Sequence, residues 1–200
     1  MMDIEIVKRE SLRLRRMASL VSHGRSIADV GFYQCPNPFL AAEKVVGIDP
    51  NADKRNLAYH YSDMFSGTLA DYIDAIGPES FDVVLAGELI EHLEVPVDFL
   101  RDCYRSLKPG GRIVLSTPNP NSLIERLLTL SLSRQYFYTT EHVMLIPQRW
   151  LIRMMEIAGF ENIRLYSGGF PFPLLGLVPF PRPWCYQTIA TGEKPLASSS

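Results

Sequence analysis

The sequence lacks three features that would each point to a particular class of protein. Its 200 residues include three cysteines with no paired spacing, so we expect no disulfide framework and favour a reducing cytoplasm. No stretch approaches the roughly 20 apolar residues of a membrane span, and the acidic residues among the first ten positions are not typical of a signal peptide. A formal net charge of −2 argues against a partner bound mainly through its phosphates, so we do not expect nucleic acid.

A chain of this size and composition is expected to form one globular domain. Apolar residues make up 46% and charged residues 21% of the sequence, an ordinary balance for a soluble protein with a substantial core. We place the domain at residues 1–193 and expect a disordered tail at residues 194–200. Residues 1–22 include an amphipathic helix (4–21) whose arginines are either solvated or turned toward an anionic substrate or membrane surface.

The most informative stretch of the chain is residues 80–120. Residues 81–86 predict a buried strand, and apolar residues then recur every three to four positions over 96–107, the spacing of a one-sided helix. A Lys-Pro-Gly-Gly turn ends that helix, and a second strand follows at 112–117. Strand, helical crossover and strand form one unit of a parallel sheet, whose ligands collect at the carboxyl ends of the strands.

The remaining elements predict an α/β fold, doubly wound and Rossmann-like, with a mostly parallel seven-stranded sheet and helices on both faces. We expect the other strands at 26–31, 44–48, 57–61, 162–166 and 185–191, and further helices at 122–132 and 147–158. Residues 168–184 are too rich in proline for an ordinary helix or central strand. We expect this segment to cover the carboxyl ends of the strands.

Several short motifs, in this order and spacing, resemble the class I S-adenosylmethionine-dependent methyltransferases. They are FDVV (81–84), ExxEHL (88–93), LKPGG (107–111) and STPN (116–119), and the resemblance extends from ADVG (28–31) to EIAGF (156–160). Within the class, the chain most resembles the ubiquinone-type O-methyltransferases and the small enzymes of glycan-modification clusters. The resemblance implies S-adenosyl-L-methionine as the cofactor.

The loop after the first strand departs from the family pattern. In the family a glycine-rich loop lies against the cofactor, because a Cβ would block the approach and some positions need positive φ. Asp29 and Gly31 match that pattern, but Phe32 and Tyr33 stand where further glycines are expected. The short spacing from Asp29 to Asp49 implies a shortened first helix. Either the cofactor lies against a differently shaped loop, with Phe32 or Tyr33 at its edge, or the cofactor site has been lost.

The resemblance assigns the rest of the cofactor site to the ends of three further strands. Asp49 ends the second strand and accepts hydrogen bonds from the ribose hydroxyls, unless it is a helix N-cap or turn residue. Asp63 and Met64 follow the third strand and meet the adenine, unless Asp63 is a solvated turn residue. Ala86 and Gly87 end the fourth strand beside the methionine moiety.

An acidic and histidine cluster follows the fourth strand directly. Glu88, Glu91 and His92 share one face of a helical turn, and the resemblance adds the distant His142. These four residues are candidate ligands of a divalent metal ion, Mg²⁺, Mn²⁺ or Zn²⁺, that orients the acceptor hydroxyl. Without a metal, His92 and Glu88 are the candidate catalytic residues, as general base or orienting groups. The third possibility is that the cluster only caps and orients the turn.

The expected reaction is methyl transfer to a hydroxyl of a small molecule, a glycan or a lipid-linked acceptor. A carboxylate and histidine cluster matters most for a weakly acidic hydroxyl, although nitrogen acceptors stay open. The apolar part of 168–184 makes a peripheral membrane contact possible. Two alternatives remain: a non-catalytic binding or dimerisation module of the same fold, and a metal-dependent RNA 2′-O-methyltransferase, which the absence of net positive charge opposes.

Overall fold

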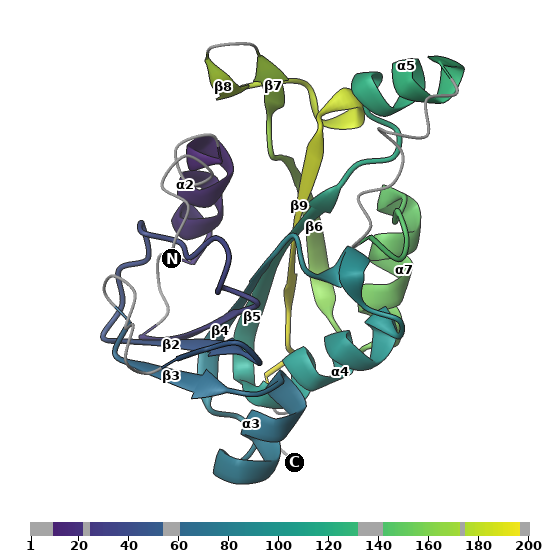
Figure 1. Ribbon diagram of the computed structural model, residues 1–200. Helices are drawn as coiled ribbons and strands as arrows, with labels where there is room; N and C mark the ends of the chain where they lie inside the picture. The colour runs from purple at the N-terminus through teal and green to yellow at the C-terminus, as the bar shows by residue number, and fades with distance from the viewer. Residues whose placement is uncertain (1–9, 22–24, 54–60, 132–141, 173–174, 197–200) are drawn as a thin grey trace.

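The computed structural model of the protein describes residues 10–21, 25–53, 61–131, 142–172 and 175–196. Its centre is a seven-stranded sheet with the order β3-β2-β1-β4-β5-β9-β6 (Figure 1). The strands, in that order, are Asp63–Ser66, Lys44–Asp49, Ser26–Val30, Phe81–Gly87, Leu107–Pro118, Gln187–Glu193 and Glu161–Ser167. Strands β3 to β5 pair in parallel, and β9 is antiparallel to both of its neighbours. The predicted fold class is confirmed.

Helices cover both faces of the sheet (Figure 1). On one face lie α3 (Leu69–Ile76), α4 (Pro96–Ser106) and α7 (Gln148–Ile157), whose apolar residues share one core cluster with that side of the sheet. On the other face lies α2 (Ser11–Ser19), which contributes to a second cluster. The central strands therefore lie between α2 on one face and α3, α4 and α7 on the other.

Local chemistry explains where two of these helices begin. Helix α3 starts with a capping box, in which the Thr68 hydroxyl accepts from the Asp71 N–H while the Asp71 carboxylate accepts from the Thr68 N–H. Helix α4 starts at Pro96, where the missing N–H costs nothing, and buries Leu100 and Cys103 on the side that faces the sheet. These apolar positions match the predicted one-sided spacing.

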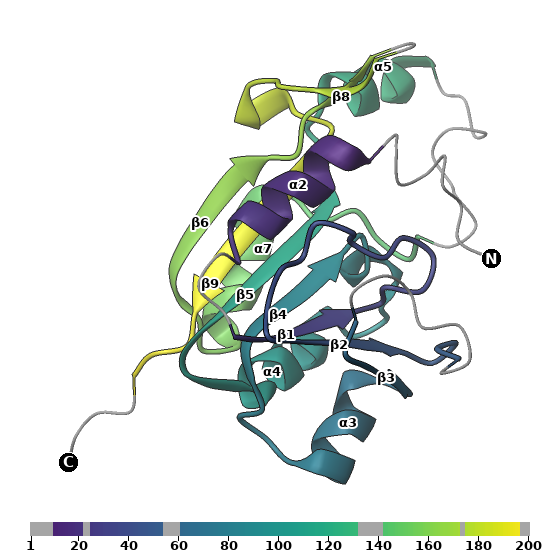
Figure 2. The same cartoon turned by 90° about the vertical axis from the view of Figure 1, so that its left-hand side faces the viewer.

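One end of the molecule is built from short elements outside the main sheet. Strands β7 (Phe170–Phe172) and β8 (Gly176–Val178) form a separate antiparallel pair. A 3₁₀ turn, η3 (Arg182–Trp184), follows them, and α5 (Leu123–Ser131) lies at the same end in both views (Figures 1 and 2). As expected, the described residues of the proline-rich segment, 168–172 and 175–184, form neither a long helix nor a strand of the main sheet.

The connection from β1 to β2 differs most from expectation. Residues 31–43, all of them described, contain no helix, whereas the spacing predicted a shortened one. Pro36 and Pro38 remove two N–H donors from this short segment, which disfavours a helix. In place of helix packing, the Phe32 ring lies directly over Gly47, where an added Cβ would meet the ring at 2.6 Å.

The bounds of other elements also differ from the predicted ones. The third strand lies at β3, after the predicted range 57–61, of which the structure describes only Tyr61. Strand β5 begins five residues early, because the Lys-Pro-Gly-Gly segment bulges between the pairs Phe81–Leu107 and Val83–Arg112. Of the expected N-terminal helix, residues 1–9 lie outside the described residues, as do residues 197–200 of the expected tail. Lys194, at the start of that tail, donates to the Leu107 carbonyl and pairs with a glutamate.

Candidate functional site

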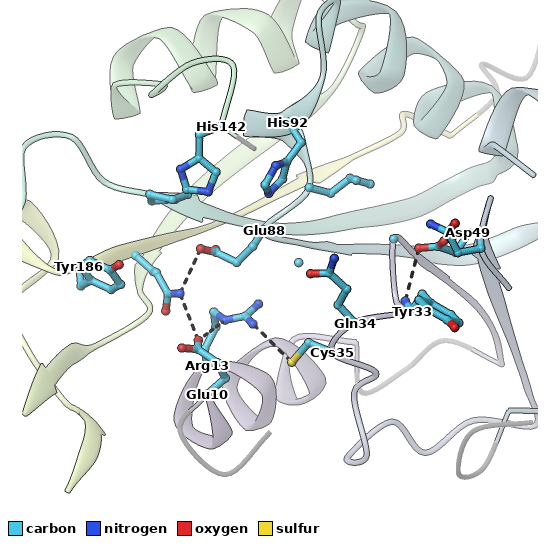
Figure 3. Close-up of a pocket in the computed structure, with 16 residues that line it drawn as sticks. Glu10, Arg13, Tyr33, Gln34, Cys35, Asp49, Glu88, His92, His142 and Tyr186 are labelled. Atoms are coloured by element: carbon cyan, nitrogen blue, oxygen red, sulfur yellow. Dashed lines mark hydrogen bonds and ion pairs between the residues drawn. The ribbon is translucent and has the colours of Figure 1, made fainter. Parts of the chain in front are cut away.

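A cavity of about 620 Å³ lies at the carboxyl ends of the central strands (Figure 3). Gly31 follows β1, Asp49 ends β2, Gly87 ends β4 and Pro118 ends β5, so four strand ends reach it. Helix α2 closes one side with Arg13. The residues that line the cavity are Glu10, Arg13, Gly31, Tyr33, Gln34, Cys35, Asp49, Asn51, Gly87, Glu88, Leu89, His92, Pro118, His142, Tyr186 and Gln187.

Asp49 and Tyr33 form one end of the cavity (Figure 3). The Asp49 side chain is buried; its Oδ1 accepts from the Asn51 N–H at 2.8 Å and its Oδ2 from the Tyr33 N–H at 3.4 Å. Asp49 therefore holds the turn after β2, the role considered as its alternative, and also lines the cavity. Each carboxylate oxygen keeps further acceptor capacity, because it has two lone pairs.

Arg13 brings a buried positive charge into the cavity. Its side chain is 3% exposed, its Nε pairs with Glu10 at 2.8 Å, and its Nη1 donates to Ser116 Oγ at 3.0 Å. Burial by itself lowers the pKa of Arg13, but the carboxylates of Glu88 and Glu10 outweigh that effect and raise it. Arg13 is thus a permanent cation at the ligand-binding edge of the sheet, neither solvated nor on the outer face of its helix.

Glu88 has an unusual backbone that aims its carboxylate into the cavity. Its φ of +51° lies in the left-handed region, which is strained for a residue with a side chain. Its Oε1 accepts from the Ser116 hydroxyl at 2.8 Å, and its Oε2 accepts from Gln187 Nε2 at 3.1 Å. Burial raises the pKa of Glu88, while Arg13 and these donors oppose the rise. The same Gln187 nitrogen reaches Glu10 at 3.1 Å, so the amide bridges two carboxylates.

Glu91, His92 and His142 converge above this network. The ligand atoms of the three residues lie within 4.8 Å of one another, and the two imidazole rings are edge to face with centroids 4.8 Å apart. The Glu91 carbonyl accepts from the N–H groups of Val143 and Met144, which brings His142 to the turn η2 (Ile90–His92). Glu88 is not in this group, so the four-ligand metal set predicted from the sequence is reduced to three.

The Glu91 carboxyl is fully buried. Its Oε2 accepts from the Thr117 hydroxyl at 3.0 Å, and its Oε1 has no hydrogen-bond partner among the described residues. Burial, with a smaller contribution from the nearby Glu88, raises the pKa of Glu91 to about 8. A buried polar atom without a hydrogen-bond partner costs free energy, so this oxygen is suited to binding a ligand.

Five residues predicted to bind the cofactor do not line the cavity. Asp29 is buried and accepts a short hydrogen bond from the Tyr61 hydroxyl. Phe32 and Met64 point into the core cluster beneath α2, and Ala86 is buried in the other cluster. Asp63 is exposed at the first residue of β3, which is the amino end of that strand and not its carboxyl end. The third strand begins at Asp63 instead of ending before it, which explains why positions 63 and 64 lie away from the carboxyl end of the strand.

Sequence reasoning also missed residues that reach the cavity from distant segments. Arg13 belongs to the N-terminal helix, whose arginines were expected to be solvated or to face an anionic surface, and spacing alone does not give the direction of its side chain. Nothing local marked Tyr186 or Gln187, which precede and begin β9 and come to the site through its pairing with β5. The missed lining residues are Glu10, Arg13, Gln34, Cys35, Asn51, Leu89, Pro118, Tyr186 and Gln187.

Among the described residues, no helix has the length and apolar character that a membrane crossing requires. The three cysteines are free thiols, and two of them are buried.

The sequence and the fold both match known proteins. A family model described as a methyltransferase domain matches residues 34–165. The ubiquinone biosynthesis O-methyltransferase of Idiomarina loihiensis is 31% identical over 174 residues, which cover 78% of this chain and 69% of that protein. The enzyme of the same name from Aliivibrio fischeri (strain MJ11) is 31% identical over 111 residues, 49% of this chain and 46% of that protein. The chain thus spans about half the length of some of the curated relatives that it matches.

A solved structure from Thermotoga maritima, described as a SAM-dependent methyltransferase and possible histamine N-methyltransferase, superposes with a TM-score of 0.71. It is 18% identical in sequence, and the match covers 94% of this chain and 92% of that one. At this identity the likeness concerns the fold alone.

Proposed function

Because this chain belongs to the family of S-adenosylmethionine-dependent methyltransferases, we propose that it methylates a hydroxyl oxygen of a small-molecule, glycan or lipid-linked acceptor. The observation that carries the proposal is the arrangement of one cavity, with an acidic residue at the end of β2 on one side and two histidines on the other. The relatives named O-methyltransferases favour oxygen over nitrogen as the acceptor. The free cysteines favour a cytoplasmic location, and we propose residues 1–193 as one domain.

The residues around the cavity fit the cofactor of the family. Gly31 and Gly87 leave the strand ends bare, since a Cβ at Gly87 would lie 2.8 Å from the Arg13 guanidinium. We propose that Asp49 accepts hydrogen bonds from the ribose hydroxyls and that Arg13 binds the methionine carboxylate through its guanidinium. Tyr33, which is 43% exposed, takes the place of the missing glycines at the edge of the site. The bound cofactor supplies a methyl group on a positively charged sulfur.

His92 is the residue that we propose to take the proton of the acceptor hydroxyl. It lines the cavity beside His142, away from the end that Asp49 and Tyr33 form (Figure 3). Both oxygens of Glu88 already accept hydrogen bonds, from Ser116 and Gln187, so we assign Glu88 to orienting the acceptor.

A metal ion is the alternative role for the histidines. Glu91, His92 and His142 offer one carboxylate and two imidazoles, a donor set that suits Zn²⁺ or Mn²⁺ better than Mg²⁺. Ligands bound at 2.0–2.2 Å lie roughly 3–3.5 Å apart, so the present separations of up to 4.8 Å must close by as much as about 1.3–1.8 Å. An ion held there would lower the pKa of a coordinated hydroxyl. A ligated His92 cannot also be the base, so the two roles exclude each other.

The end of the molecule formed by α5, β7, β8 and η3 favours a lipid-linked acceptor. Its exposed apolar side chains are 44–70% accessible: Leu123, Leu127, Phe172, Leu175 and Trp184. Scattered single apolar residues are ordinary on a surface, but several at one end suit a peripheral contact with a membrane. The exposed Arg126 and Arg182 lie on the same elements and suit anionic headgroups.

A non-catalytic binding module is the second candidate. The absence of a helix in residues 31–43 favours it, since the usual glycine-rich wall of the cofactor site is missing. For an RNA 2′-O-methyltransferase we find no comparable support, and the formal net charge of −2 opposes it.

Isothermal titration with S-adenosylhomocysteine separates the first two candidates. We expect heat of binding with a Kd below about 100 µM, because a pre-formed cavity with several polar contacts is ordinarily worth at least 5–6 kcal/mol. Binding together with methyl transfer to a catechol or sugar hydroxyl supports the enzyme. Absence of heat up to millimolar ligand refutes the proposed enzyme, and it also refutes a binding module that uses this cofactor.

A further inference from the structure

The loop over residues 31–43 forms part of the cavity wall although it has no regular structure. Tyr33, Gln34 and Cys35 all line the cavity, so their backbone must be held in place. In a Rossmann-like fold, the hydrogen-bonded first turn of a helix ordinarily fixes this segment. Here another set of contacts has to do so.

A chain of buried hydrogen bonds fixes the loop from below. The Tyr61 hydroxyl donates to the Asp29 carboxylate and accepts from the Asn37 N–H at 3.2 Å. The Asn37 Oδ1 accepts from the Phe39 N–H at 3.0 Å, closing a local turn. The Phe32 ring packs edge to face on Tyr61, with centroids 5.1 Å apart. Polar groups this deeply buried contribute to a unique conformation only when they are satisfied, as these are.

The same asparagine reaches the helix that carries Arg13. Asn37 is 1% exposed, and its Nδ2 donates to the Leu14 carbonyl at 3.0 Å. Leu14 directly follows Arg13 in α2. A helical carbonyl has a second lone pair, so it accepts this bond without losing its place in the helix. One side chain thereby ties the cavity loop to the helix turn that holds the guanidinium.

Other contacts hold the two ends of α2, and two weaker ones also join α2 to the loop: Arg13 Nη2 lies 4.0 Å from Cys35 Sγ, and the Arg15 guanidinium lies 4.2 Å from the centre of the Phe39 ring. At the C-terminal end, Arg112 Nη1 donates to the Leu20 carbonyl at 3.3 Å, and at the N-terminal end Gln187 donates to Glu10. Leu14 and Met17 pack into the core, which fixes the distance of the helix from the sheet. Apolar packing is not directional, whereas the Asn37 amide sets the register of α2 against the loop.

We propose that Asn37 is a positioning residue for cofactor binding, which acts by holding Arg13 in register with the loop of residues 31–43. The Asp29–Tyr61–Asn37 chain then takes the place of the glycine-rich turn and first helix. This inference rests on the proposed function, because it assumes that Arg13 binds the carboxylate of the cofactor.

A double-mutant cycle tests the inference with S-adenosylhomocysteine as the probe. The variants are Asn37→Ala, Arg13→Met and the double variant, with affinity measured by titration and the free energy of unfolding by urea. We expect each single variant to lose about tenfold in affinity and the double variant also about tenfold, not a hundredfold. Asn37 affects the affinity only through the position of the Arg13 guanidinium. Once Arg13 is replaced, loss of the Asn37 hydrogen bond has no further effect on affinity, so the two losses are not additive.

Thr68→Ala is the matched control for lost stability. It removes the cap of α3, which lowers the free energy of unfolding, and Thr68 does not line the cavity. We expect Thr68→Ala alone to keep the affinity of the wild type. Combined with Arg13→Met, it should keep the affinity of the Arg13→Met variant. If Asn37→Ala does not fold, Tyr61→Phe takes its place in the cycle, since it keeps the ring against Phe32 and removes only the hydroxyl that Asn37 contacts.

Each outcome of the cycle decides the matter. Additive losses, an unchanged affinity in Asn37→Ala, or an unchanged affinity in Arg13→Met overturn the inference while the proposed function stands. Wild-type protein that gives no heat with the probe refutes the proposed function, and the inference with it.

Discussion

Asp29→Asn tests a predicted cofactor residue that is ionisable and that the structure buries outside the cavity. The Asp29 carboxyl lies among α2, β1 and the loop of residues 31–43, and it accepts from the Tyr61 hydroxyl. Burial raises its pKa to about 7, against the lowering effects of Tyr61, Asn37 and Arg13. Asparagine keeps the size and the acceptor oxygen but cannot ionise, so the substitution removes the titration and preserves the contact.

The sign of the effect follows from proton linkage. Unfolded Asp29 titrates near its ordinary pKa of 3.8, so between about pH 4 and pH 7 the folded state binds a proton that the unfolded state has lost. The free energy of unfolding of the wild-type protein therefore falls as pH rises through this window, and this contribution is constant above it. A pKa difference of about three corresponds to about 4 kcal/mol, and we expect about 2–4 kcal/mol.

Urea unfolding of both proteins at pH 4.5, 6 and 8 measures this contribution directly. The free energy of unfolding of Asp29→Asn minus that of the wild type should increase by about 2–4 kcal/mol from pH 4.5 to pH 8. The other titrating groups contribute equally to both proteins and cancel in the difference. A difference that stays constant across this range would show that Asp29 is ionised in the folded protein and is not buried as described.

The remaining predictions concern the cavity and the apolar end. Asp49→Ala should weaken S-adenosylhomocysteine binding by about 1.5–3 kcal/mol in a titration, because it removes charge-assisted hydrogen bonds, and unchanged affinity in a folded variant would remove Asp49 from the site. If a metal is required, EDTA and His142→Ala should each abolish methyl transfer while leaving S-adenosylhomocysteine affinity nearly intact; full activity in EDTA with an inactive His92→Ala variant assigns His92 as a metal-free base. Phe172→Ser with Trp184→Ser should reduce sedimentation with phosphatidylglycerol vesicles, whereas Ile157→Ser, with 48% exposure on α7, should not; equal sedimentation of all variants would contradict a membrane contact at the apolar end.

Sequence patterns predicted the central part of the fold well, because its signals are local. The strand at 81–86 and the helix that begins at Pro96 have clear periodicity and stop signals, and the structure has both within a residue or two. The absent first helix was harder, since proline and a short spacing indicate a change without showing what replaces the helix. What replaces it is Phe32 over Gly47 and the Asn37 hydrogen bonds, all of which depend on tertiary contacts.

The sequence predicted those residues of the candidate site that have a local signal. Asp49, Glu88 and His92 directly follow or lie near strand ends, where the topology places ligands, and all three line the cavity. Arg13 and Gln187 reach it from the two ends of the chain, through a helix that packs back over the sheet and an antiparallel strand. Neither direction is encoded in local spacing, so no motif could have predicted them.

The most direct test of the central claim is a crystal structure of the protein with S-adenosylhomocysteine. The account predicts the ribose hydroxyls on Asp49, the carboxylate of the ligand on Arg13 and its sulfur facing the half of the cavity that contains His92. Ligand density outside this cavity, or a cavity that stays free of ligand at saturating concentration, would contradict it.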